Sequence, residues 1–302
     1  MKETSCQFGH RRQLTGIITE PSAAHRRVAL VLISAGLVPT FGPYRLYTKL
    51  ARRLAREGFL TMRFDLGGIG DSQQAYANLP LKSRTELEIR SALDYLTTHH
   101  ELDGIVLGGL CSGAEDAFRY AELDPRVTGV VLIDPFSYRT PGWKWRHLLH
   151  RLTRRSLRAL GLHKPLASSG AAGSPSDQPL LLTYKYMDHE ESSRILYNLI
   201  QRGARAHFVY TGGARDSFNH KGQLKEMYQQ IDFKGLVTLD HFPHFEHTQV
   251  FEGDRHQMVE AICERLVRAC RPMASSVPLQ PPAPARGPLQ RVIGRAAAAF
   301  MA

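Results

Sequence analysis

The chain has 302 residues, of which 43% are hydrophobic, and a formal net charge of +11. This length and composition are sufficient for one large globular domain with a substantial core. No apolar run reaches the roughly 18 residues of a transmembrane helix, and the first five residues do not resemble a signal peptide. The four cysteines do not form a disulfide framework, and no cysteine or histidine spacing fits a zinc site. We therefore expect a cytoplasmic protein with reduced thiols, no metal and no cofactor.

Short apolar runs alternate with helical patterns along the chain, which is typical of a mainly parallel sheet covered by helices. The expected strands are 14–18, 28–34, 59–64, 104–108, 127–133, 206–210 and 235–239. The expected helices are 44–57, 82–99, 114–122, 190–202 and 255–270. The chain has no internal repeat. This order of elements predicts the α/β fold class.

The expected strand at 104–108 leads into a turn of the form small-x-nucleophile-x-small, Gly109-Leu110-Cys111-Ser112-Gly113. Such a turn is so sharp that the residues two before and two after its centre nearly touch. Gly109 and Gly113 meet this demand around Cys111, whereas a turn centred on Ser112 would crowd Leu110. The N-terminal N–H groups and dipole of the next helix would favour a thiolate at the turn. We therefore interpret Cys111 as a nucleophile rather than as a buried structural cysteine.

This nucleophile turn and two further segments resemble the α/β-hydrolase superfamily. Residues 65–72, Asp-Leu-Gly-Gly-Ile-Gly-Asp-Ser, resemble the Asp-x-x-Gly-x-Gly-x-Ser segment after the fourth strand of many such enzymes. Residues 35–37 and 42–47 are similar, more narrowly, to bacterial hydrolases encoded near exosortase and secondary-metabolite loci, which are related to the serine aminopeptidase-like group. The resemblance covers about residues 14–266, without part of 143–178. It implies an α/β-hydrolase fold with a catalytic triad and leaves the substrate open.

A thiol nucleophile needs a base and a carboxylate that orients the base, and the chain order in this fold is nucleophile, acid, histidine. The acid is expected after the strand at 206–210, and the resemblance assigns this role to Asp216. Asp134, at the end of the strand at 127–133, is the alternative, because some hydrolases take their acid there. We favour Asp216 and interpret Asp134 as a residue that anchors the loop before Pro135.

Three histidines, His241, His244 and His247, precede the final helix. Related sequences carry an acidic residue, histidine and threonine at this point. Glu246-His247-Thr248 matches best, although glutamate stands where aspartate is usual. The resemblance therefore implies that His247 is the base, whereas His241 and His244 are interpreted as ordinary surface or core residues.

The oxyanion of an acyl-transfer reaction needs two preorganised donors, one after the nucleophile and one after the third strand. In this sequence these donors are the backbone N–H groups of Ser112 and Leu37. Gly36 would let the chain approach the substrate closely, although Gly36 and Gly42 also fit ordinary turns. Arg45 either reaches the pocket or caps the local helix, and we leave it out of the catalytic set.

We divide the chain into a first part of the hydrolase core (1–136), a helical cap (137–180), a second part of the core (181–271) and a tail rich in proline and alanine (272–302). Within the cap, residues 167–176 are expected to form a flexible loop that gates the site. The tail is expected to be extended or disordered over 272–288, with a short helix over 289–302. The tail adds no catalytic group.

The sequence of the cap predicts a basic amphipathic helix. No acidic residue occurs between Asp134 and Asp177. A helical projection places Trp145, Leu148, Leu149, Leu152 and Leu160 on one face. The opposite face carries Lys144, Arg151, Arg154, Arg155 and Arg158. An acidic carrier protein, an anionic substrate or a membrane surface would fit such a helix. The alternative is a lid with a solvated charged face and leucines packed over the pocket.

Together these residues predict an acyl-transfer enzyme in which Cys111 attacks a thioester or ester, carried by a small molecule or by an acyl carrier protein docked on the cap. Exchange of one thioester for another is nearly thermoneutral, so amidase activity is disfavoured. The acyl group then passes to water, an amine or an alcohol. Nucleic acid is not expected, because no recognition motif accompanies the charge. The alternative is a catalytically silent binding or scaffold protein, against which the intact triad positions argue.

Overall fold

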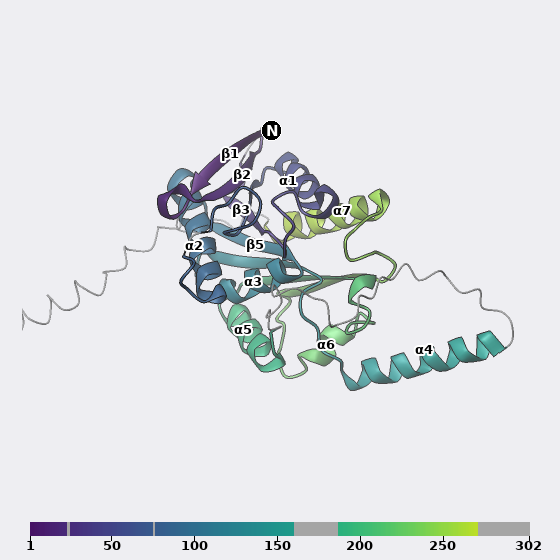
Figure 1. Cartoon of the computed structure of the whole chain (residues 1–302). Helices are drawn as coiled ribbons and strands as arrows, with labels where there is room; N and C mark the ends of the chain where they lie inside the picture. The colour runs from purple at the N-terminus through teal and green to yellow at the C-terminus, as the bar shows by residue number, and fades with distance from the viewer. Residues whose placement is uncertain (23–24, 75, 160–186, 271–302) are drawn as a thin grey trace, which may run out of the picture.

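The computed structural model of the chain describes residues 1–22, 25–74, 76–159 and 187–270, with the backbone alone for 150–151 and 153–159 (Figure 1). Within this part, eight strands form one sheet in the order β1-β2-β4-β3-β5-β6-β7-β8. Two pairings are antiparallel, those of β2 (Leu14–Glu20) with β1 (Lys2–Phe8) and with β4 (Leu60–Phe64). The other pairings are parallel and join β3 (Val28–Ile33), β5 (Gly104–Leu110), β6 (Val127–Ile133), β7 (Arg205–Thr211) and β8 (Val237–Phe242). The predicted mainly parallel sheet is confirmed.

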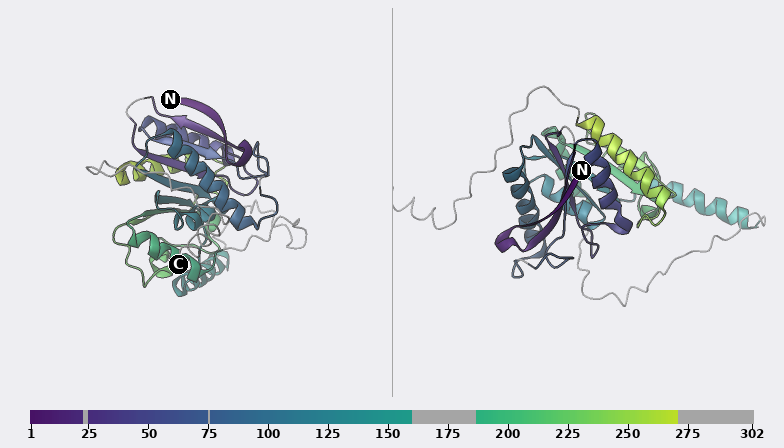
Figure 2. Two further views of the ribbon diagram at one scale, coloured as in Figure 1. Left: turned by 90° about the vertical axis from the view of Figure 1, so that its left-hand side faces the viewer. Right: turned by 90° about the horizontal axis from the view of Figure 1, so that it is seen from above.

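Helices cover both faces of this sheet, and the alternation of side chains along β3 assigns them to the faces. Val31 and Ile33 belong to the core that contains α2 (Leu81–His99), α3 (Ser112–Ala121) and α5 (His189–Gln201). Leu30 and Leu32 belong to the core beneath α1 (Leu46–Arg56) and α7 (Glu252–Ala269). Figures 1 and 2 show α1 and α7 side by side on one face. Because both faces are covered, the central strands are continuous apolar runs.

Four differences separate the sequence-based elements from those of the structure, and the first three have local causes. The helix expected from residue 44 becomes α-helical only at Leu46, because Tyr44 and Arg45 have φ values of 46° and 64°. The last strand begins at Val237 rather than at 235, after a left-handed turn at Gly235 with a φ of 71°. The sequence analysis missed β1, because only two of its seven side chains are buried. It also missed the five-residue helix α6 (Gln223–Met227).

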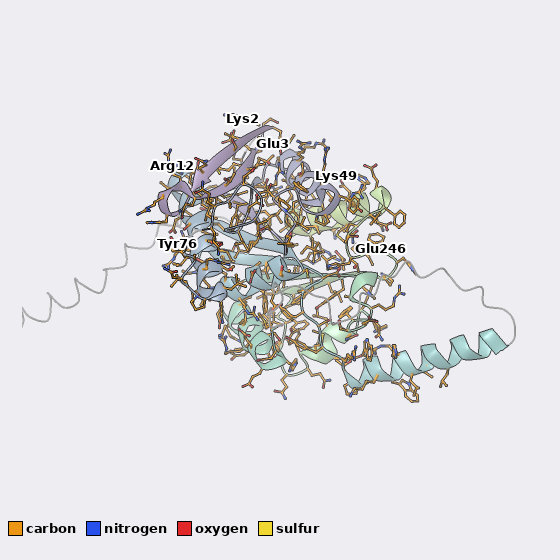
Figure 3. All side chains as sticks on the ribbon, viewed as in Figure 1. Lys2, Glu3, Arg12, Lys49, Tyr76 and Glu246 are labelled. Atoms are coloured by element: carbon orange, nitrogen blue, oxygen red, sulfur yellow. The ribbon has the colours of Figure 1, made fainter. Side chains whose placement is uncertain are left out.

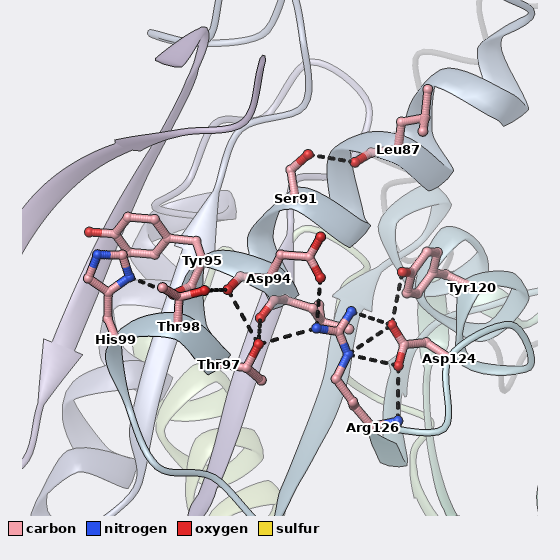
Figure 4. Close-up of polar contacts among 11 residues, drawn as sticks. Leu87, Ser91, Asp94, Tyr95, Thr97, Thr98, His99, Tyr120, Asp124 and Arg126 are labelled. Atoms are coloured by element: carbon pink, nitrogen blue, oxygen red, sulfur yellow. Dashed lines mark hydrogen bonds and ion pairs between the residues drawn. The ribbon is translucent and has the colours of Figure 1, made fainter. Parts of the chain in front are cut away.

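The amino ends of the central strands are fixed by an ion-pair network around Arg126 (Figure 4). This residue precedes β6 and is 3% exposed. Its guanidinium contacts the Asp124 carboxylate at 2.6 Å and the Asp94 carboxylate of α2 at 2.7 Å. Tyr120 of α3 also donates a hydrogen bond to Asp124, at 3.1 Å. The network joins α2, α3 and β6 at the end of the sheet opposite the nucleophile turn.

The predicted cap helix is present as α4 (Pro141–Ala159), which projects from the body of the molecule (Figures 1 and 2). Its first turn is anchored, since Trp143 is 7% exposed and Arg146 contacts Glu226 of α6 at 2.8 Å. Further along, Leu148 and Leu149 are 45% and 43% exposed. The alternative of a lid that packs these leucines over the core is therefore wrong for the described part of α4. The rest of the cap and the tail, including Leu160 and the loop at 167–176, lie outside the described residues.

Candidate active site

The nucleophile turn has the geometry that its sequence predicts. Cys111 joins β5 to α3 with a φ of 53° and a ψ of −119°, a conformation that costs free energy for a residue with a side chain. A Cβ atom on Gly109 would lie 2.4 Å from the backbone carbon of Gly113. A Cβ atom on Gly113 would lie 2.6 Å from the backbone oxygen of Ile33. The two glycines are therefore required, and Cys111 rather than Ser112 occupies the apex of the turn.

The base predicted from the sequence lies beside this turn. His247 follows β8 in the loop that leads to α7, and it forms hydrogen bonds with both Cys111 and Asp134. Its Nδ1 atom lies 2.8 Å from Oδ2 of Asp134. The loop that carries His247 packs closely against the end of β7, and this is possible because residue 213 is a glycine. A Cβ atom on Gly213 would lie 2.4 Å from Cβ of His247. His244 is exposed, and His241 packs edge-on against Phe218.

The carboxylate that contacts His247 is Asp134, so the sequence-based preference for Asp216 disagrees with the structure. Asp216 is exposed, and its backbone oxygen accepts a hydrogen bond from Arg139. The side chain of Asp134 is 3% exposed. Its two oxygens accept hydrogen bonds of 2.6 Å from the N–H and the hydroxyl of Thr211 at the end of β7. The last residue of β7 is therefore a threonine that holds the acid, and the acid itself follows β6.

The electrostatics of the site favour a protonated histidine. The hydrogen bonds of His247 with Asp134 and with Cys111 raise the pKa of the imidazole to about 10 from its ordinary value of 6.5. Burial acts in the opposite direction and is the weaker effect. At neutral pH the imidazolium therefore lies between a carboxylate and a sulfur atom. A positive charge therefore lies beside the side chain of Cys111, the candidate nucleophile.

The predicted oxyanion turn lies next to the nucleophile turn. Gly36, with a φ of 55°, donates its N–H to the Ser112 hydroxyl at 2.8 Å. The turn is closed by a hydrogen bond from the Val38 N–H to the Ala35 oxygen. Within the described residues no hydrogen bond from the Leu37 N–H is found, and its side chain is 69% exposed. These contacts place the turn beside the first residue of α3, and the role of the Leu37 and Ser112 N–H groups stays a prediction.

Tyr47, which was not singled out from the sequence, joins the ends of β3 and β5 just before the two turns. Its buried hydroxyl donates to the Ile33 oxygen at 3.1 Å and accepts from the Leu110 N–H at 2.7 Å. The last direct pair of β3 and β5 is Ile33 with Gly109, so the tyrosine bridges the strands where their ladder ends. Burial raises the pKa of this phenol, which therefore stays protonated and keeps its donor. The apolar spacing of α1 predicts a buried residue at this position but not its hydrogen bonds.

The segment at 65–72 that carried part of the resemblance has a structural role. Asp65 is 2% exposed and accepts a hydrogen bond from the Thr40 N–H at 2.7 Å. Ser72 donates its hydroxyl to the Asp65 backbone oxygen at 2.7 Å and accepts from the Thr15 N–H at 2.9 Å. A Cβ atom on Gly70 would lie 2.3 Å from the Asp65 carboxylate. The motif thus fixes the chain that leads from the oxyanion turn to α1.

The described residues contain neither a metal-ligand cluster nor a membrane-spanning helix. No group of three or more potential metal ligands occurs in this part of the chain. None of the helices described is both long and apolar enough to span a bilayer.

Comparison with known proteins gives one family and a set of structural relatives. Residues 25–254 match the family described as "Serine aminopeptidase, S33". No curated protein matches the sequence.

The structural relatives share the fold at low sequence identity. An α/β serine hydrolase homologue from Coxiella burnetii has 19% identity and a TM-score of 0.54, covering 88% of this chain and 97% of its own. DcsB, solved with its substrate analogue, has 16% identity and a TM-score of 0.58, covering 89% of this chain and 100% of its own. A Pyrococcus furiosus esterase has 13% identity and a TM-score of 0.56, covering 88% and 91%. These similarities confirm the α/β-hydrolase fold.

Proposed function

Because the chain belongs to the serine aminopeptidase S33 family of α/β-hydrolases, we propose that it is an acyl-transfer enzyme for thioesters or esters that uses Cys111, His247 and Asp134. One observation carries the proposal: the only side chain at the apex of the strained turn is a thiol, and it hydrogen-bonds a histidine whose other nitrogen contacts a buried carboxylate. This is the arrangement that nucleophilic catalysis requires. The family's description names serine, whereas this chain carries cysteine at the apex.

The position of Ser112 supports cysteine as the nucleophile. Ser112 is the first residue of α3, past the residue with positive φ, and its hydroxyl oxygen accepts the Gly36 N–H. A serine nucleophile would need to transfer its proton to His247. His247 hydrogen-bonds the side chain of Cys111. We therefore assign Ser112 to the oxyanion side of the site, through its N–H.

In the proposed reaction the Cys111 thiolate attacks the carbonyl carbon of the substrate and forms a new C–S bond. The oxygen becomes an oxyanion, which the N–H groups of Leu37 and Ser112 would stabilise. Collapse of this intermediate breaks the bond to the leaving thiolate or alkoxide, which receives a proton from the His247 imidazolium. The products of this half-reaction are an acyl-Cys111 and a free thiol or alcohol.

The second half-reaction repeats these steps with another nucleophile. Neutral His247 takes a proton from water, an amine or an alcohol, which attacks the acyl-Cys111 carbonyl. The C–S bond then breaks and restores the thiolate. Asp134 keeps the Nδ1–H of the histidine directed towards itself throughout, so that the other nitrogen faces the reacting atoms. Amide substrates are disfavoured, because a thiolate leaves a tetrahedral intermediate more readily than an amide nitrogen does.

We further propose that α4 recruits an acidic acyl carrier protein. The described apolar side chains Trp145 and Leu148 are 62% and 45% exposed, and Figures 1 and 2 show α4 extending away from the body. The sequence of α4 contains no acidic residue. An acidic partner would therefore meet a basic helix with an apolar stripe. The side chains of Arg151, Arg154, Arg155 and Arg158 lie outside the described set. The exosortase association and the cytoplasmic location also stay predictions.

A substrate panel tests the proposed reaction class. Purified protein is incubated with an acyl thioester, the matching oxygen ester and the matching peptide amide, and product formation is measured by chromatography. We expect turnover of the thioester and the ester and none of the amide. Turnover of the amide alone would contradict the proposed substrate class. Absence of all turnover, together with no labelling of Cys111 by an acyl-thioester analogue, would favour the silent binding protein.

A further inference from the structure

A cavity of about 740 Å³ lies on the α1 side of the sheet, outside the Cys111 site. Its walls come from β1, β2 and β4 on one side and from the Thr40–Arg45 segment and α1 on the other. The volume lies within the roughly 300–1,000 Å³ that is common for small-molecule sites. Figure 3 shows Glu3 of this cavity at the edge of the molecule near β1, apart from Glu246 beside His247. No catalytic residue assigned above lines it.

The charged walls of the cavity consist of three arginines and one glutamate: Arg45, Arg52, Arg63 and Glu3. Both carboxylate oxygens of Glu3 accept hydrogen bonds from two of these arginines. Its Oε2 atom accepts two from Arg52, and its Oε1 atom accepts one from Arg63. Although burial opposes this, the two arginines hold the pKa of Glu3 below its ordinary value. One carboxylate therefore faces three guanidinium groups, which leaves two positive charges without a counter-charge among the described residues of the wall.

Two of the arginines have unused donors. The side chain of Arg63 is 5% exposed, and its Nε atom is buried without a hydrogen-bond partner in the part of the chain that the structure describes. Burial lowers the pKa of this guanidinium, as expected for a cation that is incompletely compensated. The guanidinium of Arg45 makes no hydrogen bond or ion pair with any described residue. Since the Nε atom of Arg63 is closed to solvent, Arg63 contributes its charge to the cavity wall, whereas the exposed Arg45 is open to a ligand.

The backbone that presents Arg45 is itself unusual. Tyr44 and Arg45 both have positive φ values, 46° and 64°, although neither is a glycine. Two successive residues in this region cost free energy, and such strain is concentrated at ligand-binding sites and other functional positions. Arg45 also stands at the N-cap of the eleven-residue helix α1, where the partial positive charge of the helix dipole adds to that of the arginines.

The remaining walls are apolar. Ile17, Phe41 and Tyr44 line the cavity, and Phe41 and Tyr44 are 46% and 55% exposed. Aromatic side chains this exposed offer a surface for an apolar or aromatic ligand body. The cavity thus combines a cationic end with an apolar wall.

We propose that this cavity binds a small phosphate-bearing molecule whose phosphate contacts Arg45 and Arg52, with Arg63 adding its charge behind them, and whose apolar part packs on Phe41 and Tyr44. A phosphate dianion matches the two uncompensated charges, whereas a carboxylate would neutralise only one of them. Guanidinium groups are suited to phosphate because their planar donors bind two oxygens at once. The inference goes beyond the acyl-transfer reaction and does not depend on it.

The test is direct binding to the intact wild-type chain by isothermal titration calorimetry. The probes are phenyl phosphate, inorganic phosphate and benzoate, which separate the contributions of the phosphate, the apolar body and a single negative charge. We expect phenyl phosphate to bind more tightly than either of the other two. Equal binding of inorganic phosphate would contradict the role of the apolar wall, and tighter binding of benzoate would contradict the choice of phosphate.

Variants locate the site. Arg45→Gln removes a guanidinium that has no partner in the described protein, so the fold is expected to remain intact, which thermal unfolding checks. The variant should weaken phenyl phosphate binding by about tenfold, the size of effect expected for a lost charge-assisted contact. Arg90→Gln, an exposed arginine on α2, is the matched control and should change binding less than about twofold. Equal losses in the two variants, or no binding by the wild type, would overturn the proposal. Because binding is measured without turnover, an inactive Cys111 site would not affect the result.

Discussion

Two regions of the molecule differ in how firmly they are held in place. One is formed by the carboxyl ends of β5, β6 and β7, and the other is the helix α4. At the strand ends, Asp134 is 3% exposed and its oxygens accept three hydrogen bonds. Cys111 is fixed by a turn that tolerates no Cβ at Gly109 or Gly113. In α4, the first turns are anchored through Trp143 and Arg146, whereas Leu149 is 43% exposed. In the function proposed above, the strand ends carry out the chemistry and α4 recruits the substrate carrier.

The largest expected effect separates the two aspartates. Asp134→Asn removes the charge that orients and stabilises protonated His247, and should lower kcat by about 10²–10⁴. Asp216→Asn, the matched control, should change kcat by less than about threefold, because Asp216 is exposed and no contact of its side chain with His247 is found. Steady-state kinetics on a small thioester provide the measurement. A larger loss in Asp216→Asn would restore the acid predicted from the sequence.

The next prediction concerns pH. His247 must donate a proton to the leaving group, so kcat/KM should fall as the pH rises through the pKa of about 10. In Asp134→Asn the largest cause of the raised pKa is removed, and the alkaline limb should move to lower pH. The same shift applies to stability. Because the folded-state pKa lies above the ordinary value of 6.5, the stabilisation by protonated His247 is complete below about pH 6.5 and is lost as the pH rises through about 10.

The pH prediction is checked with full pH profiles of wild type, Asp134→Asn and Asp216→Asn. The last variant should keep the wild-type alkaline limb. For stability, the difference in Tm between wild type and His247→Gln should decrease over the same pH range. An alkaline limb that is identical in wild type and Asp134→Asn would show that the carboxylate does not control the histidine.

A smaller effect is expected at Tyr47, whose hydroxyl hydrogen-bonds the ends of β3 and β5 beside the nucleophile turn. Tyr47→Phe leaves the buried Ile33 oxygen and Leu110 N–H without their partner. The unfolding free energy should decrease by about 1–3 kcal/mol. Urea denaturation measures this change, with Tyr44→Phe as the control, since Tyr44 is 55% exposed. Equal stability of Tyr47→Phe and wild type would mean that water or a backbone shift satisfies both groups.

The smallest effect is expected at α4. Reversal of two charges, in the double variant Arg154→Glu and Arg155→Glu, should lower kcat/KM several-fold for an acyl group on an acidic carrier protein and spare a free thioester. The reason is that attraction between proteins is screened over about 8 Å at physiological ionic strength, whereas carbonyl chemistry at Cys111 is not. Added salt should have the same selective effect. The control reverses Arg90 and Arg205, which are exposed elsewhere.

Two outcomes of the α4 experiment would change the comparison between the regions. Equal losses on both substrates would mean that α4 affects the fold or the site itself. No loss on either substrate would mean that its basic face is only solvated. Either result would contradict carrier recruitment.

The sequence was informative where a residue type is dictated by local geometry. The spacing of Gly109 and Gly113 around Cys111 predicts the turn, because the close backbone contacts depend on neighbours in the chain. The matching motif around His247 was sufficient to locate a histidine that the structure places beside Cys111. By contrast, the partner of that histidine depends on how the ends of β6 and β7 pack. The Thr211 hydroxyl donates a hydrogen bond to the Asp134 carboxylate where the two strands end, and no pattern in the sequence predicts this contact.

The cap shows the other limit of sequence analysis. Its helical periodicity predicts α4, and the exposed Leu148 and Leu149 show that periodicity does not reveal which surface, if any, covers the apolar face. The hydroxyl of Tyr47 shows the same limit in the core. A buried tyrosine and a buried phenylalanine have the same spacing in a helix, and only the three-dimensional structure shows that this one bridges β3 and β5.

The central claim is that Cys111 carries the acyl group, and intact-protein mass spectrometry after brief incubation with a panel of acyl thioesters tests it most directly. Wild type should gain the mass of one acyl group, and Cys111→Ala should gain none. Ser112→Ala should still be acylated, at a reduced rate, because the Ser112 hydroxyl accepts the Gly36 N–H and so belongs to the oxyanion side of the site. Acylation of Cys111→Ala together with loss of acylation in Ser112→Ala would contradict the account.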